Sequence, residues 1–418
     1  MVRQRSDDDR IVVTGMGAIT PLGLNVADSW QGMIEGRSGV DYISAFDPTE
    51  YPVRIAAEIK GFDPTVRINV KEARRMARCS QLAIVAAYEA LEDAGLTTPF
   101  ADPDRVGVLL GTAIGGFDEA AEGVVVIHEQ GYRKLSPFVL AASLPNIPAH
   151  YLSHYFASTG YISTITTACA SGAQAIGEAA EVIRRGTADI VISGGVESMI
   201  CPALLSGFFA MRALSTRNDS PATASRPFDA DRDGLVLGEG CAIFVLERLS
   251  VARARAVRIY AEVLGHASSS DAYHVAQPDP EGKGAARVMS WALQDAGLAP
   301  EEVDYINAHA TGTPLGDIAE TVAIKKVFGD HAYRIPISAT KSMIGHGFGA
   351  GGAIEALACI LSIRDGIVHP TINLERPDPQ CDLDYTPHRA RTVEVRYAMN
   401  NSFGFGGQNA CLVFGAVE

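Results

Sequence analysis

Cysteine and histidine patterns typical of metal or disulfide sites are missing from this chain. Its seven cysteines are scattered, no CxxC pair occurs, and neither an HxE nor an HExxH pattern is present. Common zinc motifs and a disulfide framework are therefore excluded. We expect no metal site, and thiols that stay reduced in a cytoplasmic compartment.

Positive charge and long apolar runs are also scarce. The chain has 35 basic against 49 acidic residues, a net charge of −14, which argues against a nucleic-acid-binding surface. No uninterrupted apolar run reaches the ~18 residues of a membrane-spanning helix. The N-terminal segment MVRQRSDDDR has no apolar signal region. We expect a cytoplasmic protein that binds no nucleic acid and does not insert into a membrane.

The pattern of strands and helices starts again near residue 255. The 418 residues exceed what one core usually spans. Each part alternates strands and helices, which predicts two duplicated α/β halves, residues 1–255 and 256–418, with a site at their shared interface. Four echoes appear in the same order: ALEDAGL (90–96) and ALQDAGL (292–298), DRVGVLLGT (104–112) and EEVDYINAHATGT (301–313), SGAQAIGEAAEVI (171–183) and GAGGAIEALACIL (349–361), GEGCAIFVLE (238–247) and GGQNACLVFG (406–415).

Cys169 lies in the stretch around which the chain is organised, residues 162–186. A β-branched run over 162–166 predicts a strand, and apolar positions from Gly172 onward recur at helical spacing until Gly186. The thiol should therefore lie near a helix N-terminus, where partial positive charge lowers its pKa and favours the thiolate. A buried structural cysteine is the alternative interpretation.

Two histidines of the second half lie at the ends of predicted strands. His309 opens the turn HATGTPLGD, and His346 lies where ISATKSMIGHGFGAGG breaks into glycine-rich backbone before a helix. The junction at His346 is the counterpart of the junction at Cys169. Ligands of open α/β folds bind at the carboxyl ends of strands. We therefore expect all three side chains in one site.

Four motifs resemble the signature motifs of a known enzyme family: TACASG around Cys169, HATGTPLGD with His309, TKSMIGH with Lys341 and His346, and NSFGFGG at 401–407. RALSTRND (212–219) and SRPFDADRDGLVLGEG (225–240) add to this resemblance. In this order they resemble the elongating β-ketoacyl-acyl-carrier-protein synthases of the thiolase superfamily. The resemblance implies a thiolase-like five-layer αβαβα fold, a homodimer, and an acyl carrier protein as partner. It implies no cofactor, because the phosphopantetheine is carried by the substrate.

The resemblance also implies a reaction, the decarboxylative condensation of an acyl group with malonyl-carrier protein in fatty acid elongation. Cys169 would hold the acyl group as a thioester, and the two histidines would assist loss of CO2, with neither one's individual part decided. Backbone N–H groups of Cys169 and Phe403 would form the oxyanion hole. Lys341 would give electrostatic support with Glu355 as its partner, and Asp317 and Glu320 match family acids with structural roles.

Further positions match the family's binding residues. Thr311 and Thr313 resemble residues that contact the pantetheine arm. Ile114, Phe208 and Val139 match the acyl pocket, and Val139 stands where an aromatic is often found, which predicts a roomier pocket. Basic side chains on an acidic protein could steer the acidic carrier protein. The candidates are Arg74, Arg75, Arg78, Arg133, Lys134 and Arg212.

One alternative function stays open at this point, the ketosynthase subunit of a type II polyketide synthase. Such a subunit could pair with a chain-length partner in a heterodimer, and TGTPLG leans slightly toward it. A non-catalytic partner subunit would lack the nucleophile, whereas Cys169 is present. A thiolase would place a second cysteine in a glycine turn, whereas Cys411 lies in an apolar strand. Three-carbon-priming relatives have asparagine in place of His346.

Overall fold

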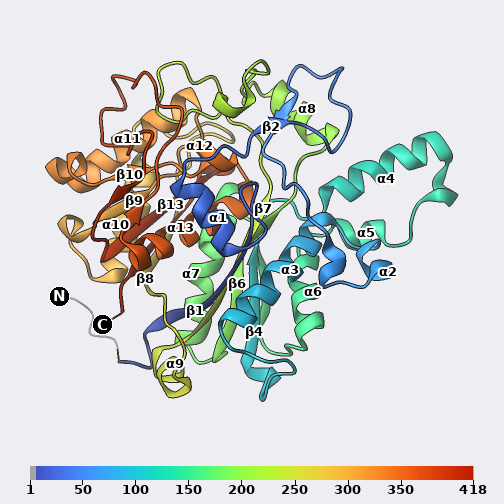
Figure 1. Ribbon diagram of the computed structural model, residues 1–418, viewed down its shortest axis with the longest axis horizontal. Helices are drawn as coiled ribbons and strands as arrows, with labels where there is room; N and C mark the ends of the chain where they lie inside the picture. The colour runs from blue at the N-terminus through green and yellow to red at the C-terminus, as the bar shows by residue number, and fades with distance from the viewer. Residues whose placement is uncertain (1–5, 418) are drawn as a thin grey trace.

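A ten-stranded mixed sheet runs through the computed structural model, which describes residues 6–417 (Figure 1). The expectation for the N-terminal segment falls partly on residues 1–5, which lie outside the described residues. Two short ribbons, β2 with β3 and β11 with β12, flank this sheet. The strands are β1 Ile11–Ile19, β2 Asp41–Tyr42, β3 Ile55–Ala56, β4 Val106–Gly111, β5 Ile162–Ile165, β6 Ile190–Glu197, β7 Gly240–Arg248, β8 Ala261–Ser270, β9 Tyr305–Asn307, β10 Ile337–Ser338, β11 Ile367–Val368, β12 Arg391–Thr392, β13 Tyr397–Gly404 and β14 Gln408–Gly415.

The strand order of the large sheet repeats itself. The first five strands follow the order β5-β4-β6-β7-β1, and the second five follow β10-β9-β13-β14-β8. In both sets the two outer pairs are parallel and the two inner pairs are antiparallel. The sets join where β1 pairs with β8, at Val12↔Glu262 and Val13↔Ala261. Where two strand segments of the sequence resemble each other, one lies in the first set of strands and the other lies in the second set.

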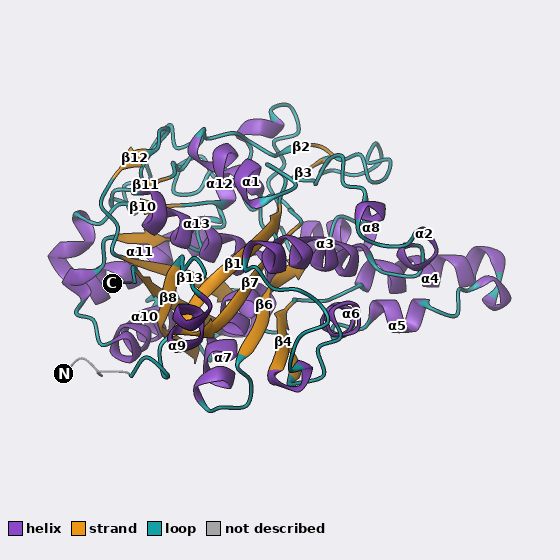
Figure 2. Ribbon diagram, turned by 60° about the horizontal axis from the view of Figure 1, so that its bottom comes forward, coloured by secondary structure: helices purple, strands orange, loops and turns teal. Residues whose placement is uncertain are grey.

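Helices form three layers around the two halves of the sheet (Figure 2). α7 and α13 contact each other and strands of both halves, so they form the central layer, whereas α3 and α6 cover the first half and α10 and α11 belong to the outer side of the second. The helices are α1 Val26–Ile34, α2 Val70–Ala73, α3 Arg78–Asp93, α4 Phe117–Gln130, α5 Val139–Ser143, α6 Ile147–Phe156, α7 Ser171–Arg184, α8 Pro202–Ala210, α9 Leu249–Arg255, α10 Lys283–Ala296, α11 Pro314–Phe328, α12 Lys341–Ile344 and α13 Gly351–Asp365.

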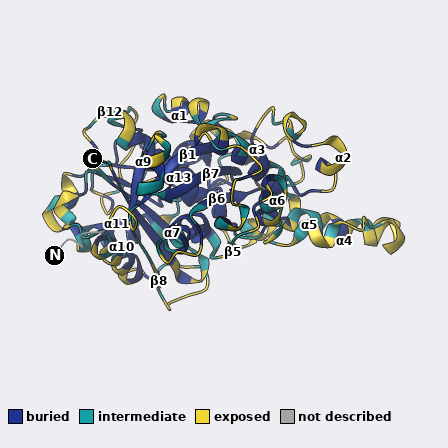
Figure 3. Cartoon of the chain, turned by 90° about the horizontal axis from the view of Figure 1, so that it is seen from below, coloured by how far each residue is buried: buried dark blue, intermediate teal, exposed yellow. Residues whose placement is uncertain are grey.

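The central helices are largely buried because apolar and small residues predominate in both, although α7 keeps a partly exposed polar stripe that includes Glu178 and Glu181. α13 is fully buried from Gly351 to Ser362, and it has no polar face that would need water. Figure 3 shows α7 and α13 inside the molecule. The layers therefore follow the order αβαβα, as the sequence predicted.

Two features of the first half differ from a plain layered structure. The helical stretch over 70–93 breaks into α2 and α3 because Ala77 takes extended backbone. α4 and α5 project from the body as an arm (Figure 1). The arm leaves large apolar side chains exposed, including Val124, Tyr132 and Leu140. Among residues 6–417, no helix is both long and apolar enough to cross a bilayer.

Candidate active site

Cys169 lies at the junction that leads from β5 into α7. A single 3-10 turn, Ala168–Ala170, follows Thr167 and runs directly into the helix. Ser171 fastens this junction, because its hydroxyl accepts the Thr167 N–H at 2.8 Å and donates to the Ala168 carbonyl at 2.6 Å. Cys169 is only 4% exposed. The nucleophile candidate is thus rigidly held and almost closed off from bulk water.

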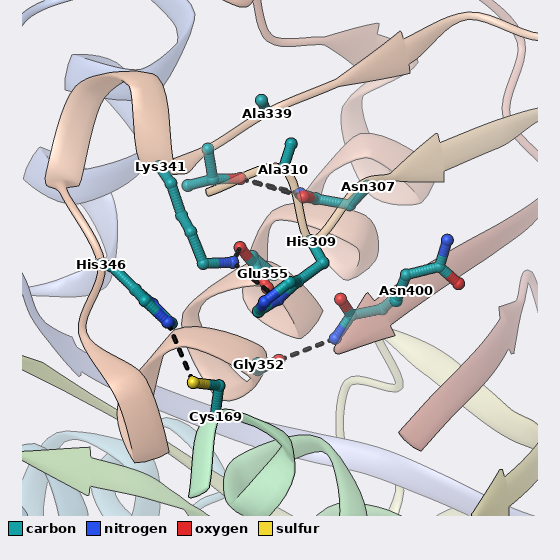
Figure 4. Close-up of polar contacts among 12 residues, drawn as sticks. Cys169, Asn307, His309, Ala310, Ala339, Lys341, His346, Gly352, Glu355 and Asn400 are labelled. Atoms are coloured by element: carbon teal, nitrogen blue, oxygen red, sulfur yellow. Dashed lines mark hydrogen bonds and ion pairs between the residues drawn. The ribbon is translucent and has the colours of Figure 1, made fainter. Parts of the chain in front are cut away.

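His346 reaches Cys169 from the other half of the molecule (Figure 4). Its Nε2 atom lies 3.0 Å from Sγ of Cys169. Its Nδ1 atom accepts the Phe348 N–H at 3.3 Å, and the Phe348 ring stacks on the imidazole at 4.2 Å. A neutral imidazole has one N–H and one acceptor nitrogen. Since Nδ1 accepts, the hydrogen is on Nε2, which faces the sulfur.

His309 also carries its ring hydrogen on Nε2, but for a different reason. Nζ of Lys341 lies 3.4 Å from Nδ1 of His309 and has only hydrogens to offer, so Nδ1 again accepts and Nε2 carries the hydrogen. Lys341 is also ion-paired with Glu355, and both are buried. The two imidazole rings stand edge to face at 5.5 Å. Both histidines are therefore oriented as N–H donors.

Burial determines the charge of this group. It lowers the pKa of His309 and of His346 well below the usual range, and the positive charge of Lys341 acts in the same direction. Burial also raises the pKa of Glu355 to about 7, against the opposing effect of Lys341. At neutral pH both imidazoles are therefore uncharged, and they can donate hydrogen bonds without being acids.

The expectation of a lowered pKa for the Cys169 thiol is wrong. Burial raises this pKa to about 12, although Lys341 and two backbone N–H groups act to lower it. The helix N-terminus is present as expected, but its partial charge is smaller than the cost of desolvating a thiolate. The resting group is a thiol, and the negative charge on sulfur has to form during the reaction.

The backbone N–H that faces the sulfur belongs to Phe405 instead of Phe403. The N–H groups of Phe405 and of Cys169 itself both interact with the thiol. The Phe403 side chain packs on His309 with ring centroids 5.6 Å apart. The motif NSFGFGG contains both phenylalanines, and only the backbone shows which amide is directed inward. At Gly404 a Cβ atom would lie 2.7 Å from the Thr167 carbonyl oxygen, so only glycine allows this close approach.

Glu320 and Asp317 support the loop that carries His309. Glu320 accepts the N–H groups of His309 and Ala310 at 2.9 and 2.8 Å. Asp317 accepts the N–H groups of Phe228 and Gly312 at 2.8 and 3.1 Å. Both carboxylates hold backbone in place and neither has an interaction with Cys169.

A cavity of about 570 Å³ leads to Cys169 and both histidines. Thr311, Thr313 and Arg212 line it, and the two threonine hydroxyls lie 3.0 Å apart. Its size fits a substrate arm of small-molecule dimensions.

The expected acyl-pocket residues fall into two groups. Ile114 and Phe208 pack in the apolar cluster that contains Cys169. Val139 packs instead against Gly123 of α4, and within residues 6–417 it lines neither this cavity nor the second one described below. The inference of a roomier pocket from Val139 therefore has no support within a single chain.

The basic candidates are spread over several surfaces. Only Arg212 lines the cavity that leads to Cys169. Arg78 is no surface cation, because its guanidinium is paired with Glu239. Arg74 and Arg75 follow α2, where the guanidinium of Arg75 lies 4.7 Å from the Phe138 ring. The remaining two belong to the arm: Arg133 and Lys134.

Among residues 6–417, two side-chain groups have ligand atoms close enough for a metal ion. One is Cys169, His309 and His346, and the other is Glu181, His266 and Asp295, with atoms within 4.8 Å in each group. In the first group the Lys341 ammonium is directed at His309, and a positive charge there opposes a dication and favours an anion. The arrangement therefore suits negative charge that develops on sulfur or oxygen.

Comparison with known proteins agrees with this geometry. Residues 8–252 match the family "Beta-ketoacyl synthase, N-terminal domain", and residues 260–375 match "Beta-ketoacyl synthase, C-terminal domain". The chain is 47% identical to 3-oxoacyl-[acyl-carrier-protein] synthase 2 of Synechocystis over 97% of each chain. It is also 47% identical to the protein of that name from Coxiella burnetii, over 98% of this chain and 99% of that one.

Solved structures extend the likeness to the fold. The ishigamide ketosynthase/chain length factor matches with a TM-score of 0.92 at 36% identity, over 98% of this chain and 99% of that one. A type II polyketide ketosynthase, solved with its acyl-carrier protein and bound to a hexaketide, matches with a TM-score of 0.90 at 35% identity and the same coverage. The fold is therefore thiolase-like, as predicted.

The protein is thus a condensing enzyme of the acyltransferase class. It belongs to the β-ketoacyl synthase family, whose two domains together match most of the chain.

Proposed function

We propose that this enzyme elongates fatty acids by condensing a Cys169-bound acyl group with malonyl-acyl-carrier protein. The observation that carries the proposal is the convergence of three N–H donors from the second half on one nucleophile of the first. These are Nε2–H of His346 at 3.0 Å from the sulfur, the His309 imidazole with a ring nitrogen within 4.8 Å of it, and the backbone N–H of Phe405.

Acyl transfer comes first in the proposed sequence. The Cys169 sulfur attacks the thioester carbonyl of the acyl-carrier protein, and the oxyanion is held by the N–H groups of Cys169 and Phe405. The carbon–sulfur bond to pantetheine breaks, and the thiol proton leaves with the pantetheine sulfur. The acyl-enzyme keeps the chain on the side where Ile114 and Phe208 pack with Cys169.

Decarboxylation and condensation follow. Malonyl thioester enters through the cavity lined by Thr311 and Thr313. Its carboxylate leaves as CO2, and the electron pair forms an enolate whose oxygen accepts the two Nε2–H donors of the histidines. The enolate carbon then attacks the acyl carbonyl, a carbon–carbon bond forms, and the Cys169 thiolate leaves. The products are 3-oxoacyl-carrier protein and CO2, and the thiolate recovers a proton from solvent.

Assembly and location complete the proposal. β5 is an edge strand with Ile162 49% exposed, and the arm leaves apolar side chains uncovered. These features support a homodimer that covers the edge strand and the arm.

Carrier-protein docking is proposed at the cavity mouth near Arg212, with Arg74, Arg75, Arg133 and Lys134 as steering charges. A cytoplasmic location would keep all seven free cysteines reduced.

A polyketide ketosynthase is the second candidate. The solved polyketide ketosynthases support it, at 36% and 35% identity. The two curated synthases support fatty acid elongation at 47% identity, which is why elongation is the main proposal.

The test is incubation with malonyl-carrier protein and saturated acyl-carrier proteins, with products measured by mass spectrometry. We expect 3-oxoacyl products two carbons longer than each acyl primer. Products that contain several unreduced keto groups from the enzyme alone would favour the polyketide alternative. The absence of condensation with any acyl chain would overturn the proposal.

A further inference from the structure

A second cavity, of about 660 Å³, lies beside the acyl side of the site. Its walls come from residues 44–46, the start of α3, the first part of α4 and residues 198–203, which follow β6. Phe46 and Ile200 line this cavity and also pack in the apolar cluster that contains Cys169. The cavity wall and the nucleophile therefore belong to one apolar cluster.

The wall is more polar than a hydrocarbon pocket requires, and most of its charged groups are already paired. Glu58 accepts two backbone N–H groups, from Ser44 and Ala45. Glu239 accepts the Arg78 guanidinium and the Ile59 N–H. These groups are held within the wall and have little left to offer to a ligand.

Asp118 and Glu122 are the exceptions: Glu122 is exposed, whereas Asp118 has a buried oxygen without a partner. Asp118 lies in the first turn of α4, four residues after Ile114, and lines the cavity. Its Oδ1 atom is buried and has no hydrogen-bond partner among the described residues. Burial raises the pKa of Asp118 against the lowering effect of the Glu119 and Asp118 backbone N–H groups, and the charges of Glu239 and Glu122 raise it further. A carboxyl that holds its proton more readily than usual can donate as well as accept.

We infer that the second cavity receives the far end of the acyl chain, and that Asp118 hydrogen-bonds an oxygen carried there as a hydroxyl or carbonyl group. A plain methyl end would bury Oδ1 against hydrocarbon and leave it unpaired, which is unfavourable. An oxygenated chain end would satisfy it. Sites built around a buried polar group discriminate against ligands that lack its partner. The inference rests on the proposed condensing activity and names the acyl chains that this activity prefers.

The experiment compares pairs of acyl-carrier proteins of equal chain length, one with a terminal hydroxyl and one without, over a graded series of medium chains. The readout is the ratio of the two kcat/KM values within a single enzyme preparation, so partial loss of folded enzyme cancels. Asp118→Leu removes the hydrogen bond at similar size, and Asp118→Asn retains a donor and an acceptor. Glu129→Gln, at an exposed position of the same helix, is the matched control.

We expect the wild type to favour the hydroxylated member at the chain length that reaches the cavity. Asp118→Leu should lower this ratio by about tenfold, whereas Asp118→Asn and Glu129→Gln should keep most of it. An unchanged ratio in Asp118→Leu, or a wild type that favours the plain chain at every length, would overturn the inference. Both outcomes leave condensation of plain chains intact, so they differ from failure of the proposed function, in which neither chain is extended.

Discussion

A Cβ atom placed on Gly172 would lie 2.5 Å from the carbonyl oxygen of Gly349. Gly172 is in the first turn of α7, and Gly349 is in the short turn Phe348–Ala350 that leads into α13. The equivalent junctions of the two halves thus touch through their backbones. This contact sets the spacing between Cys169 and His346, and no side chain could fill the gap without separating them.

Gly172→Ala should therefore damage both stability and activity. We expect a loss of ~1–3 kcal/mol in the free energy of unfolding, because the new methyl group overlaps backbone that cannot rotate away. Condensing activity should fall at least about tenfold, since small displacements of reacting groups are costly. Urea denaturation and steady-state kinetics measure the two effects.

Gly207→Ala is the matched control, because it lies in α8 and a Cβ atom there would meet nothing within 4 Å. This variant should be unchanged or slightly more stable. Equal losses in the two glycine variants would mean that the contact with Gly349 has no special role.

Cys169→Ala should abolish condensation but leave decarboxylation of malonyl-carrier protein in place. Condensation should fall by at least ~10³-fold because no acyl-enzyme can form. Release of CO2 from malonyl-carrier protein should continue, since the N–H donors of His309 and His346 are retained. Mass spectrometry of the intact protein and labelled CO2 release measure these outcomes. Condensation at the wild-type rate in this variant would contradict the proposed mechanism.

Lys341→Met should shift the acid limb of the pH–rate profile. Lys341 helps to lower the pKa of His309, so its removal raises this pKa, and protonation then inactivates the enzyme at a higher pH than in the wild type. The buried carboxyl of Glu355 also loses its partner, which should cost about 3–5 kcal/mol of stability.

The double variant Lys341→Met, Glu355→Leu should recover much of the lost stability, because no unpaired charge is left buried. It should still show the shifted acid limb. If the limb stayed in place while stability fell, Lys341 would be only a structural partner of Glu355.

Alkylation of Cys169 should be slow at neutral pH and accelerate as the pH rises. Its pKa, raised to about 12 by burial, keeps the thiolate fraction small below that value, so the rate should increase about tenfold per pH unit through the mildly alkaline range. Iodoacetamide labelling followed by peptide mass spectrometry gives this rate. The measurement is made in Cys201→Ser, since Cys201 is the one cysteine in the described chain that is not fully buried. A rate already at its plateau near neutral pH would show that the resting group is a thiolate.

Sequence alone was sufficient for the parts of the site that depend on chain order. Cys169 and His346 lie at equivalent strand-to-helix junctions, and a duplicated fold brings such junctions together. The αβαβα layers follow for the same reason, because both halves repeat one pattern of strands and helices.

Other features of the site depend on burial and backbone direction, which a sequence motif does not specify. The pKa of the Cys169 thiol follows from burial, which outweighs the helix N-terminus. The choice of Phe405 over Phe403 depends on which backbone amide is directed inward. Asp118 could not be found, because its cavity combines segments that are far apart in the chain.

The position of Phe405 has a consequence for the synthesis of the protein. Cys169 leaves the ribosome early, but the amide of Phe405 follows only after more than half of the chain has been added, close to its last strand, β14. Incomplete chains therefore carry the thiol without the groups that make it useful. Truncated forms that end before Phe405 should therefore lack the amide that holds the oxyanion, and they should not catalyse acyl transfer at the rate of the finished enzyme.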